Sequence, residues 1–414
     1  MKRIFLLLLL LFTPFFVWAL EFPKVNSKIV EIYDLKDKKI IYDIKSNDKA
    51  SIASLTKIAT TITAIENISN LDEQVTITSK ILNTVRWDAS RAGLKVGDKV
   101  TYRDLLYASI IPSGADATNS IAILSSGSIE NFVKKMNNLA NKIGLKNTHF
   151  SNVTGLDDKD HYSTADDVRK LLEYSLNNST FREIFTTKNY ELTNKLKVRS
   201  TFYLYSKDNE FVNTQITGAK TGFTLDAGYC LASLSNINGH EMIVVVLKAD
   251  LINNNYYHAI DTVSLISFLK ENYKEQLLLE KNKVIKEIPV VLSKVDSYKI
   301  YSGNDVKKYL PSDFNKDFLK IKYDGLDELS YKNRENDKIG VVSYYYKDSL
   351  ITKEDIYLNE KIEMNFSKVL KKNLPLIIIF FILLILFIIL RRKIKRLKRL
   401  KRRMRLRKQR KQFV

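Results

Sequence analysis

The chain has 414 residues, of which 45% are hydrophobic and 11% aromatic, so it is long enough for two or three domains and too apolar to be disordered or collagen-like. The formal net charge is +21, but residues 391–411 hold fifteen Lys or Arg and no acid, so most of the excess charge belongs to a C-terminal tail. One cysteine, Cys230, and four scattered histidines exclude an intrachain disulfide and a Cys/His zinc site.

The first residues have the three-part pattern of a secretory signal peptide. Lys2 and Arg3 precede an apolar run, and Ala19 is the small residue before the expected cleavage point. An uncleaved membrane anchor is the alternative interpretation. In either case residues 1–19 predict that the chain following them is exported.

Residues 20–278 are predicted to form one domain that mixes strands and helices. Two short strands joined in a hairpin are expected first, then a mostly helical stretch, and then strands around an Asn-Gly turn. The predicted strands are 29–33, 40–43, 229–234 and 242–247, and the predicted helices are 54–66, 102–111, 129–143 and 258–273. This order predicts an antiparallel sheet flanked by helices, with a helical insert, of class α/β or α+β.

From residue 279 to residue 366 the pattern changes to short alternating runs that are typical of strands. The runs are 288–292, 298–301, 318–323, 339–346 and 355–358. We predict a small all-β domain here. It contains neither Cys nor His, which favours a spacer or docking role over a chemical one.

A second apolar run, residues 374–390, contains no charged residue. A helix of about 17 residues spans roughly 26 Å, slightly less than a bilayer core of roughly 30 Å, and the basic residues on both sides can snorkel to close the gap. We therefore predict one transmembrane helix over residues 373–391, with Pro375 in its first turn. The positive-inside rule then puts residues 392–414 in the cytoplasm and the two predicted domains, residues 20–278 and 279–366, on the outer side of the cell membrane.

The basic tail has three candidate roles. Ile394, Leu397, Leu400 and Met404 recur at near-helical spacing, so a helix would lay an apolar stripe on the inner leaflet and hold its basic residues near anionic headgroups. A plain determinant of membrane topology is the second role, and nucleic-acid binding is the third. Because the tail lacks interleaved aromatic residues that stack on bases, no specific nucleic acid is expected as a partner.

The segment Ser54-Leu55-Thr56-Lys57 places a serine and a lysine three residues apart at the start of a predicted helix. Residues at this spacing share a helix face, so the Lys57 amine can reach the Ser54 hydroxyl. A serine becomes a nucleophile when a neighbouring base takes its proton, and a lysine can serve once burial and nearby positive charge lower its pKa. The alternative is a helix N-cap serine with a solvated lysine, and the motif alone favours that interpretation.

Two further motifs follow along the chain. Ser113-Gly114-Ala115 precedes a helical run, and Lys220-Thr221-Gly222 is expected in a stretch before the strand at 229–234. Each is also compatible with an ordinary turn. The three motifs in this order are a far rarer coincidence than any one of them.

These motifs resemble the S-x-x-K, S-D-N and K-T-G motifs of penicillin-binding proteins. The wider sequence is similar to the low-molecular-mass members, the serine D-alanyl-D-alanine carboxypeptidases of peptidoglycan. The similar segments are 51–57, 93–97, 105–106, 144–150, 155–156, 162–165, 218–224 and 227–230. The resemblance covers about residues 22–366. It implies a β-lactamase/transpeptidase-like catalytic fold and a β domain that holds it off the membrane.

The resemblance also implies a role for each motif residue. Ser54 would be the acylated nucleophile, Lys57 its general base, and Ser113 a proton relay to the leaving amine. The backbone N–H groups of Ser54 and Phe223 would form the oxyanion hole, and the K-T-G segment would bind the substrate carboxylate. The implied substrate-binding residues are Lys220, Thr221, Gly222 and Phe223. Neither a metal nor an organic cofactor is implied.

Two positions depart from the pattern of the family. The second motif usually ends in Asn, whose amide contacts the substrate, and here Ala115 stands in its place. The loss of one such contact costs about 1–3 kcal/mol unless another group replaces it. The loop before Gly155 often carries His, and here Thr154 occupies that position, which bears on the rate of deacylation.

The sequence thus predicts a membrane-anchored serine D-Ala-D-Ala carboxypeptidase. It would remove the terminal D-alanine from peptidoglycan stem peptides through an ester on Ser54, with β-lactams as covalent inhibitors. A non-catalytic or weakly active penicillin-binding cell-wall protein is the alternative, based on Ala115 and Thr154. A β-lactamase ranks third, because class A enzymes use a deacylating Glu and residues 152–167 contain none.

Overall fold

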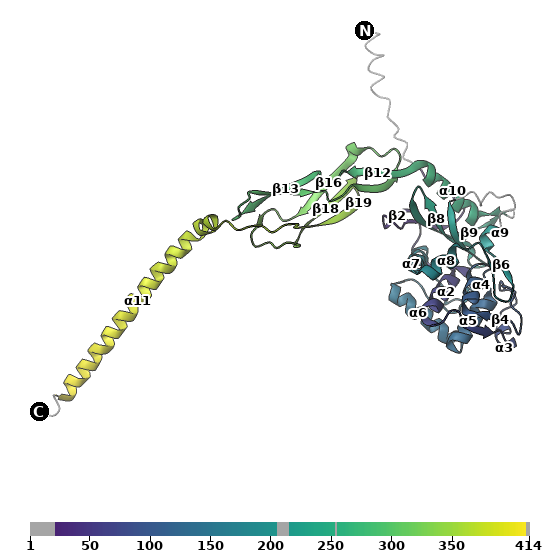
Figure 1. The fold of residues 1–414 in the computed structure, drawn as a ribbon, viewed down its shortest axis with the longest axis horizontal. Helices are drawn as coiled ribbons and strands as arrows, with labels where there is room; N and C mark the ends of the chain where they lie inside the picture. Colours follow the sequence, from purple (N-terminus) through teal and green to yellow (C-terminus); the bar gives the residue numbers. More distant parts are fainter. Residues whose placement is uncertain (1–20, 205–214, 253–254, 411–414) are drawn as a thin grey trace, which may run out of the picture. The chain divides into compact units, whose positions relative to one another are not determined.

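The computed structural model describes residues 21–204, 215–252 and 255–410 (Figure 1). The predicted signal peptide lies outside the described residues. The described chain divides into two compact units. The first runs to Gln276 and also includes Tyr309–Asp313, and the second comprises Leu277–Lys308 and the chain from Phe314 onward.

A five-stranded antiparallel sheet forms the centre of the first unit, in the order β2-β1-β9-β8-β7 (Figure 1). Its strands are β1 (Ile29–Asp34), β2 (Lys39–Ile44), β7 (Ile216–Thr224), β8 (Gly228–Ile237) and β9 (His240–Ala249). The predicted hairpins β1–β2 and β8–β9 are both confirmed. Strand β7 was not predicted: the K-T-G segment lies inside this strand and not in a turn before β8.

Helices cover both faces of this sheet, so β1, β8 and β9 are buried along most of their length. The helical insert between β2 and β7 packs on one face, and α10 packs on the other. The helices are α2 (Thr56–Asn67), α3 (Ser79–Leu82), α4 (Tyr102–Ile110), α5 (Ala115–Ser126), α6 (Ile129–Ile143), α7 (Ala165–Leu176), α8 (Ser179–Thr186), α9 (Thr201–Leu204) and α10 (Tyr257–Asn272). The predicted α/β architecture, an antiparallel sheet flanked by helices, is therefore confirmed.

Local signals in the sequence set the helix ends. Thr101 and Asp104 form a capping box at the start of α4, and the Ser128 side chain caps α6. Gly144 ends α6 in the left-handed conformation, with φ +84°. Three short ribbons complete the unit: β3 (Gln74–Thr76) with β4 (Lys99–Thr101), β5 (Asn189–Glu191) with β6 (Lys197–Arg199), and β10 (Leu251–Ile252) with β11 (Asn255–Tyr256).

Strands dominate the chain from residue 273 to residue 357, as the alternating runs predicted. They are β12 (Tyr273–Leu279), β13 (Val284–Val291), β14 (Ser297–Tyr301), β15 (Val306–Pro311), β16 (Leu319–Gly325), β17 (Leu329–Ser330), β18 (Lys338–Tyr346) and β19 (Ser349–Tyr357). A small apolar core that includes Ile288, Val290, Ile300 and Ile339 holds the second unit together.

The C-terminal helix α11 runs from Phe366 to Arg410 and is 45 residues long. Its apolar stretch has a mean hydropathy of 3.2 and is not buried against the protein, so the helix fits a membrane anchor. Pro375 lies well inside this helix, so its predicted place in the first turn is wrong. The helix starts earlier than the apolar run because the Asn365 side chain accepts the N–H of Lys368 and caps it.

Candidate active site

Ser54 and Lys57 are in contact at the start of α2. Ser54 lies in a 3₁₀ turn, Ala53–Leu55, directly before α2, and not in the first turn of the α-helix as predicted. The Lys57 side chain nevertheless reaches back, and its Nζ lies 2.8 Å from Ser54 Oγ and 2.8 Å from the carbonyl oxygen of Thr154. Burial lowers the pKa of Lys57 to about 7, although the negative charge of Asp116 opposes that effect. At neutral pH a large share of this amine is uncharged and can accept a proton.

The backbone before Ser54 has an unusual conformation, which hydrogen bonds from Thr56 and His161 support. Ala53 has φ +47°, which is rare for a residue other than glycine. His161 accepts the Ser151 N–H at Nδ1, so its Nε2 carries the proton and donates to Thr56 Oγ1 at 2.7 Å. Thr56 Oγ1 in turn donates to the Ala53 carbonyl oxygen at 2.9 Å. Burial lowers the pKa of His161 to about 4, so this chain of hydrogen bonds keeps one neutral tautomer.

Gly155 is required at the same place for a steric reason. Its φ is +85°, and a Cβ built on it would lie 1.8 Å from the carbonyl oxygen of Ala53. The loop that carries Thr154 therefore passes against the turn that carries Ser54, with no room for a side chain at position 155. The sequence pattern pointed to Gly155 but not to the supporting roles of His161 and Thr56. The available signal was that His161 is one of only four histidines in the chain.

Ser113 and Lys220 form the second pair. Ser113 precedes α5 with φ +62°, and its Oγ accepts a hydrogen bond from Lys220 Nζ at 2.9 Å. Lys220 also donates to the Thr221 carbonyl oxygen at 2.7 Å. Burial holds the pKa of Lys220 well below its usual range, and the positive charge of Lys57 lowers it further. The electrostatic coupling of the two buried lysines unites the first and third motifs in one site.

Strand β7 passes directly beside the turn that carries Ser54. A Cβ built on Gly222 would lie 3.0 Å from the backbone nitrogen of Ser54 and 3.0 Å from the Ala53 Cβ. Thr221 Oγ1 lies 2.6 Å from Thr201 Oγ1, and the Phe223 ring is 47% exposed. Glycine at 222 thus permits the close approach of the strand that carries Lys220 to the turn that carries Ser54.

The two departures from the family pattern have different structural consequences. Thr154 contacts Lys57 through its backbone carbonyl, while its hydroxyl donates to Asn152 Oδ1. The side chain at position 154 therefore does not supply the contact to Lys57. Ala115 is buried at the start of α5 and has no polar side-chain atom to offer a substrate.

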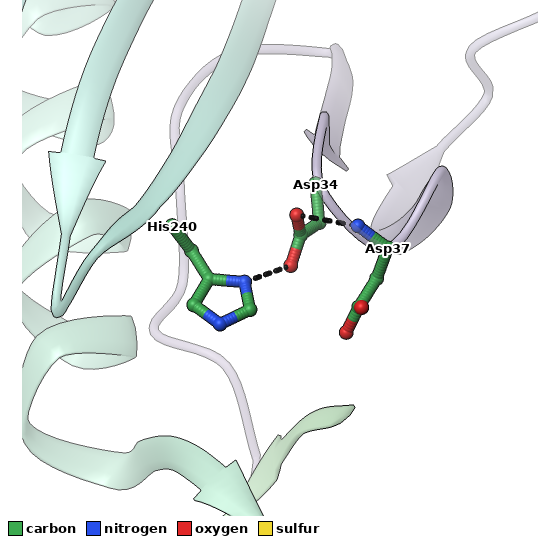
Figure 2. Close-up of side chains that lie close together, drawn as sticks. All are labelled: Asp34, Asp37 and His240. Carbon is green, nitrogen blue, oxygen red and sulfur yellow. Dashed lines mark hydrogen bonds and ion pairs between the residues drawn. The ribbon is translucent and has the colours of Figure 1, made fainter. Parts of the chain in front are cut away.

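A separate cluster combines Asp34, Asp37 and His240, whose potential ligand atoms lie within 4.8 Å of one another (Figure 2). Asp34 Oδ2 pairs with His240 Nδ1 at 2.7 Å, and its Oδ1 accepts the N–H groups of Lys36 and Asp37. Asp37 Oδ2 accepts the Tyr309 N–H at 2.8 Å. Because the chain itself supplies these partners, we assign the cluster to holding the β1–β2 turn and not to chemistry.

Comparison with known proteins identifies the family. The model of the D-alanyl-D-alanine carboxypeptidases, peptidase family S11, matches residues 17–251. The chain belongs to this family. It is therefore a serine peptidase of the penicillin-binding protein class, as the motifs predicted.

Individual relatives agree with this assignment. The chain is 30% identical over 271 residues to D-alanyl-D-alanine carboxypeptidase DacF of Bacillus subtilis, which covers 64% of this chain and 67% of that protein. It is 30% identical over 253 residues to D-alanyl-D-alanine endopeptidase of Escherichia coli, over 60% of this chain and 78% of that protein. Penicillin binding protein 5 from Haemophilus influenzae has a similar fold, with a TM-score of 0.68, 24% identity, and coverage of 83% of this chain and 100% of that one.

Proposed function

We propose that this serine peptidase removes the terminal D-alanine from peptidoglycan stem peptides through an ester on Ser54. The contact between Lys57 Nζ and Ser54 Oγ at 2.8 Å, in a buried site that lowers the pKa of the lysine, carries the proposal. A neutral amine at hydrogen-bond distance from a serine hydroxyl is the arrangement that general-base activation requires.

In the acylation step, Lys57 takes the proton of Ser54 as its oxygen attacks the carbonyl carbon of the penultimate D-alanine. The negative charge that develops on the carbonyl oxygen is stabilised by the backbone N–H groups of Ser54 and Phe223, and such donors are commonly worth about 3 kcal/mol each. Ser113 relays the proton held by Lys57 to the leaving nitrogen, the C–N bond breaks and D-alanine departs, and water then hydrolyses the ester and returns a proton to Ser54 Oγ. No step in this sequence requires a metal or an organic cofactor.

Substrate recognition is assigned to the K-T-G segment of β7. The substrate carboxylate would bind Lys220 and Thr221, and the bound anion would favour the charged form of Lys220 and so oppose the burial that lowers its pKa. Gly222 supports this role by letting β7 lie against the nucleophile turn. β-Lactams carry a carboxylate beside a strained amide, so they would acylate Ser54 by the same route.

The alternative function, a weakly active penicillin-binding protein, rested on Ala115 and Thr154, and the contact made by Thr154 does not support it. Thr154 contacts Lys57 through its carbonyl oxygen, so the absence of a histidine side chain does not remove that contact. Ala115 remains the position that separates a full enzyme from a binding protein. Cleavage of cross-links is a second candidate activity, since two of the similar proteins are named D-alanyl-D-alanine endopeptidases.

We also propose a topology for the whole chain. Residues 20–278 would form the catalytic domain and 279–366 the β domain, both outside the cell membrane, with a spanning segment at 373–391 and a cytoplasmic tail at 392–414. The exposed apolar stretch of α11 and the basic residues after it support this arrangement. Removal of residues 1–19 as a signal peptide belongs to the same proposal.

The test is D-alanine release from an acyl-Lys-D-Ala-D-Ala tripeptide by the full-length protein in detergent. Ser54→Ala is the control, and labelling with fluorescent penicillin is measured on both proteins. Release and labelling by the wild type alone are expected. Equal labelling of Ser54→Ala would refute the nucleophile, and labelling without release would favour the binding-protein alternative.

A further inference from the structure

A groove of about 330 Å³ lies in the second unit, between strands β14 and β19. This volume falls within the roughly 300–1,000 Å³ that is typical of sites for small ligands. Two apolar side chains of its lining, Ile300 and Val306, are buried. All of the residues that line the groove belong to the second unit, so it is a different site from that of Ser54.

Three tyrosines give this groove flat aromatic surfaces. Tyr301 at the end of β14 and Tyr357 at the end of β19 are 51% and 46% exposed. Tyr298 is packed against the apolar core of the second unit, and its hydroxyl accepts the Asn359 N–H at 3.3 Å. Rings that are half exposed keep apolar area that a ligand with an apolar face can cover.

The polar side chains of the groove include both donors and acceptors of hydrogen bonds. The side-chain amides of Asn304 and Asn359 can each donate and accept, and the Glu354 carboxylate accepts. A ligand that stacks on the tyrosine rings can therefore also be bound at its edge, provided that the edge carries hydroxyl or amide groups. Aromatic walls with a few polar groups are the usual lining of a site that orients its ligand.

The charges of the groove favour a neutral ligand. Three carboxylates and one amine, that of Lys299, line it, so a polyanion would be repelled. Two of the carboxylates already have partners in the protein, which weakens their attraction for a cationic chain. Asp305 Oδ1 accepts the Lys281 N–H at 2.9 Å. Asp355 Oδ1 forms an ion pair with Lys338 Nζ at 2.7 Å.

We propose that this groove binds a neutral saccharide chain of N-acetylated amino sugars, with sugar rings stacked on Tyr301 and Tyr357. A sugar ring has an apolar C–H face and carries hydroxyl and acetamido groups at its edge, which match the tyrosine rings and the asparagine amides. The choice of amino sugars rests on the proposed function, because such a chain carries the stem peptides of peptidoglycan. A second site for the same polymer raises the effective concentration of stem peptides at the catalytic unit.

The test is calorimetric titration of the full-length protein with chitotetraose, the tetramer of N-acetylglucosamine. The detergent must not have a sugar headgroup, because such a headgroup would compete. Saturable binding is expected, and Tyr301→Ala and Tyr357→Ala should each weaken it about fivefold, the effect of one lost aromatic contact. Tyr301→Phe keeps the ring and should retain most of the affinity. Phe318→Ala is the matched control, because Phe318 is also 51% exposed in the second unit but does not line the groove.

Two further ligands decide the chemistry of the occupant. Maltotetraose lacks acetamido groups and should bind about tenfold more weakly, as expected for one or two lost hydrogen bonds, and equal binding would overturn the assignment to amino sugars. Tetralysine should not bind; binding of this peptide in place of chitotetraose would identify a peptide site and overturn the proposal. Absence of saturable chitotetraose binding, or a loss in Phe318→Ala equal to that in Tyr301→Ala, would overturn it as well.

D-Alanine release from the acyl-Lys-D-Ala-D-Ala tripeptide is measured separately on the same proteins. The groove variants should release D-alanine and label with fluorescent penicillin at the wild-type rate, because the tripeptide carries no saccharide. Chitotetraose binding without D-alanine release would support the groove while refuting the proposed turnover. Release without chitotetraose binding would refute the groove and leave the proposed function standing.

Discussion

The rate at which a β-lactam acylates Ser54 should follow the protonation state of Lys57. Only the neutral amine can take the hydroxyl proton, and burial lowers the pKa of Lys57 to about 7 from a usual value near 10.5. With that pKa, roughly one tenth of the amine is neutral at pH 6 and roughly nine tenths at pH 8. The acylation rate constant should therefore rise about tenfold across this interval and level off above pH 8.

A lysine with its ordinary pKa would give a different profile. Its neutral fraction would rise about tenfold for every pH unit, so the rate would increase about a hundredfold from pH 6 to pH 8 and continue upward beyond pH 9. The assay is time-resolved labelling of the full-length protein with fluorescent penicillin between pH 5.5 and 9.5 at constant ionic strength. A rise that continues without a plateau to pH 9.5 would refute the reasoning.

Asp116→Asn provides a variant that moves the profile in a known direction. The charge of Asp116 raises the pKa of Lys57, so its removal should shift the midpoint of the profile to lower pH. The variant will also be less stable, because the Asp116 carboxylate accepts the N–H groups of Ala92, Gly93 and Leu94. The direction of the midpoint is therefore the decisive quantity, and a shift to higher pH would contradict the assignment.

Three further predictions concern the site and the core around it. Gly155→Ala should cut the penicillin-labelling rate at least tenfold, because the new Cβ would collide with the carbonyl oxygen of Ala53, directly before Ser54. Gly127→Ala should change that rate little, because Gly127 has a similar φ of +77° but open space around it. The folded protein lowers the pKa of Lys57, so the unfolded chain binds more protons between pH 7 and 9 and the folded protein becomes more stable as the pH rises. Relative to Lys57→Met, the wild type should gain up to about 1.4 kcal/mol of unfolding free energy per pH unit in this interval, measured by urea denaturation. A difference in unfolding free energy between the two proteins that does not change with pH would contradict this. Arg169→Met should cost about 3–5 kcal/mol in the same assay, because it leaves the fully buried Glu31 without the partner at 2.9 Å.

The sequence predicted those parts of the fold that depend on local signals. The Asn238-Gly239 turn predicted the β8–β9 hairpin, and alternating apolar residues predicted an all-β segment after residue 279. Strand β7 was not predicted, because two of its positions are glycines that close packing requires and that are unfavourable in a strand. A Cβ on Gly218 would lie 2.7 Å from the Phe185 ring, and Gly222 lies against the turn that carries Ser54. These glycines remove the β-branched pattern by which strands are recognised.

The contacts of the candidate site also differ in how far the sequence predicted them. The contact of Lys57 with Ser54 followed from their spacing of three residues, because local geometry brings them together. The pairing of Lys220 with Ser113 spans 107 positions, so only the resemblance of the motifs to a known family implied a shared site. The contact of Lys57 with Thr154 involves a backbone carbonyl, which every residue possesses, so no residue type in the sequence could reveal it.

The two buried lysines also connect substrate binding with base catalysis under the proposed roles. Positive charge on Lys57 lowers the pKa of Lys220, and the same Coulomb interaction acts in the opposite direction with equal strength. A substrate carboxylate that pairs with Lys220 favours the charged form of that amine. The negative charge of the bound carboxylate offsets the positive charge on Lys220, so Lys57 faces a pair of nearly zero net charge and keeps its lowered pKa. Truncating the substrate carboxylate removes the partner of Lys220, so it should lower the affinity for the substrate, measured as the peptide concentration that halves the rate of fluorescent-penicillin labelling.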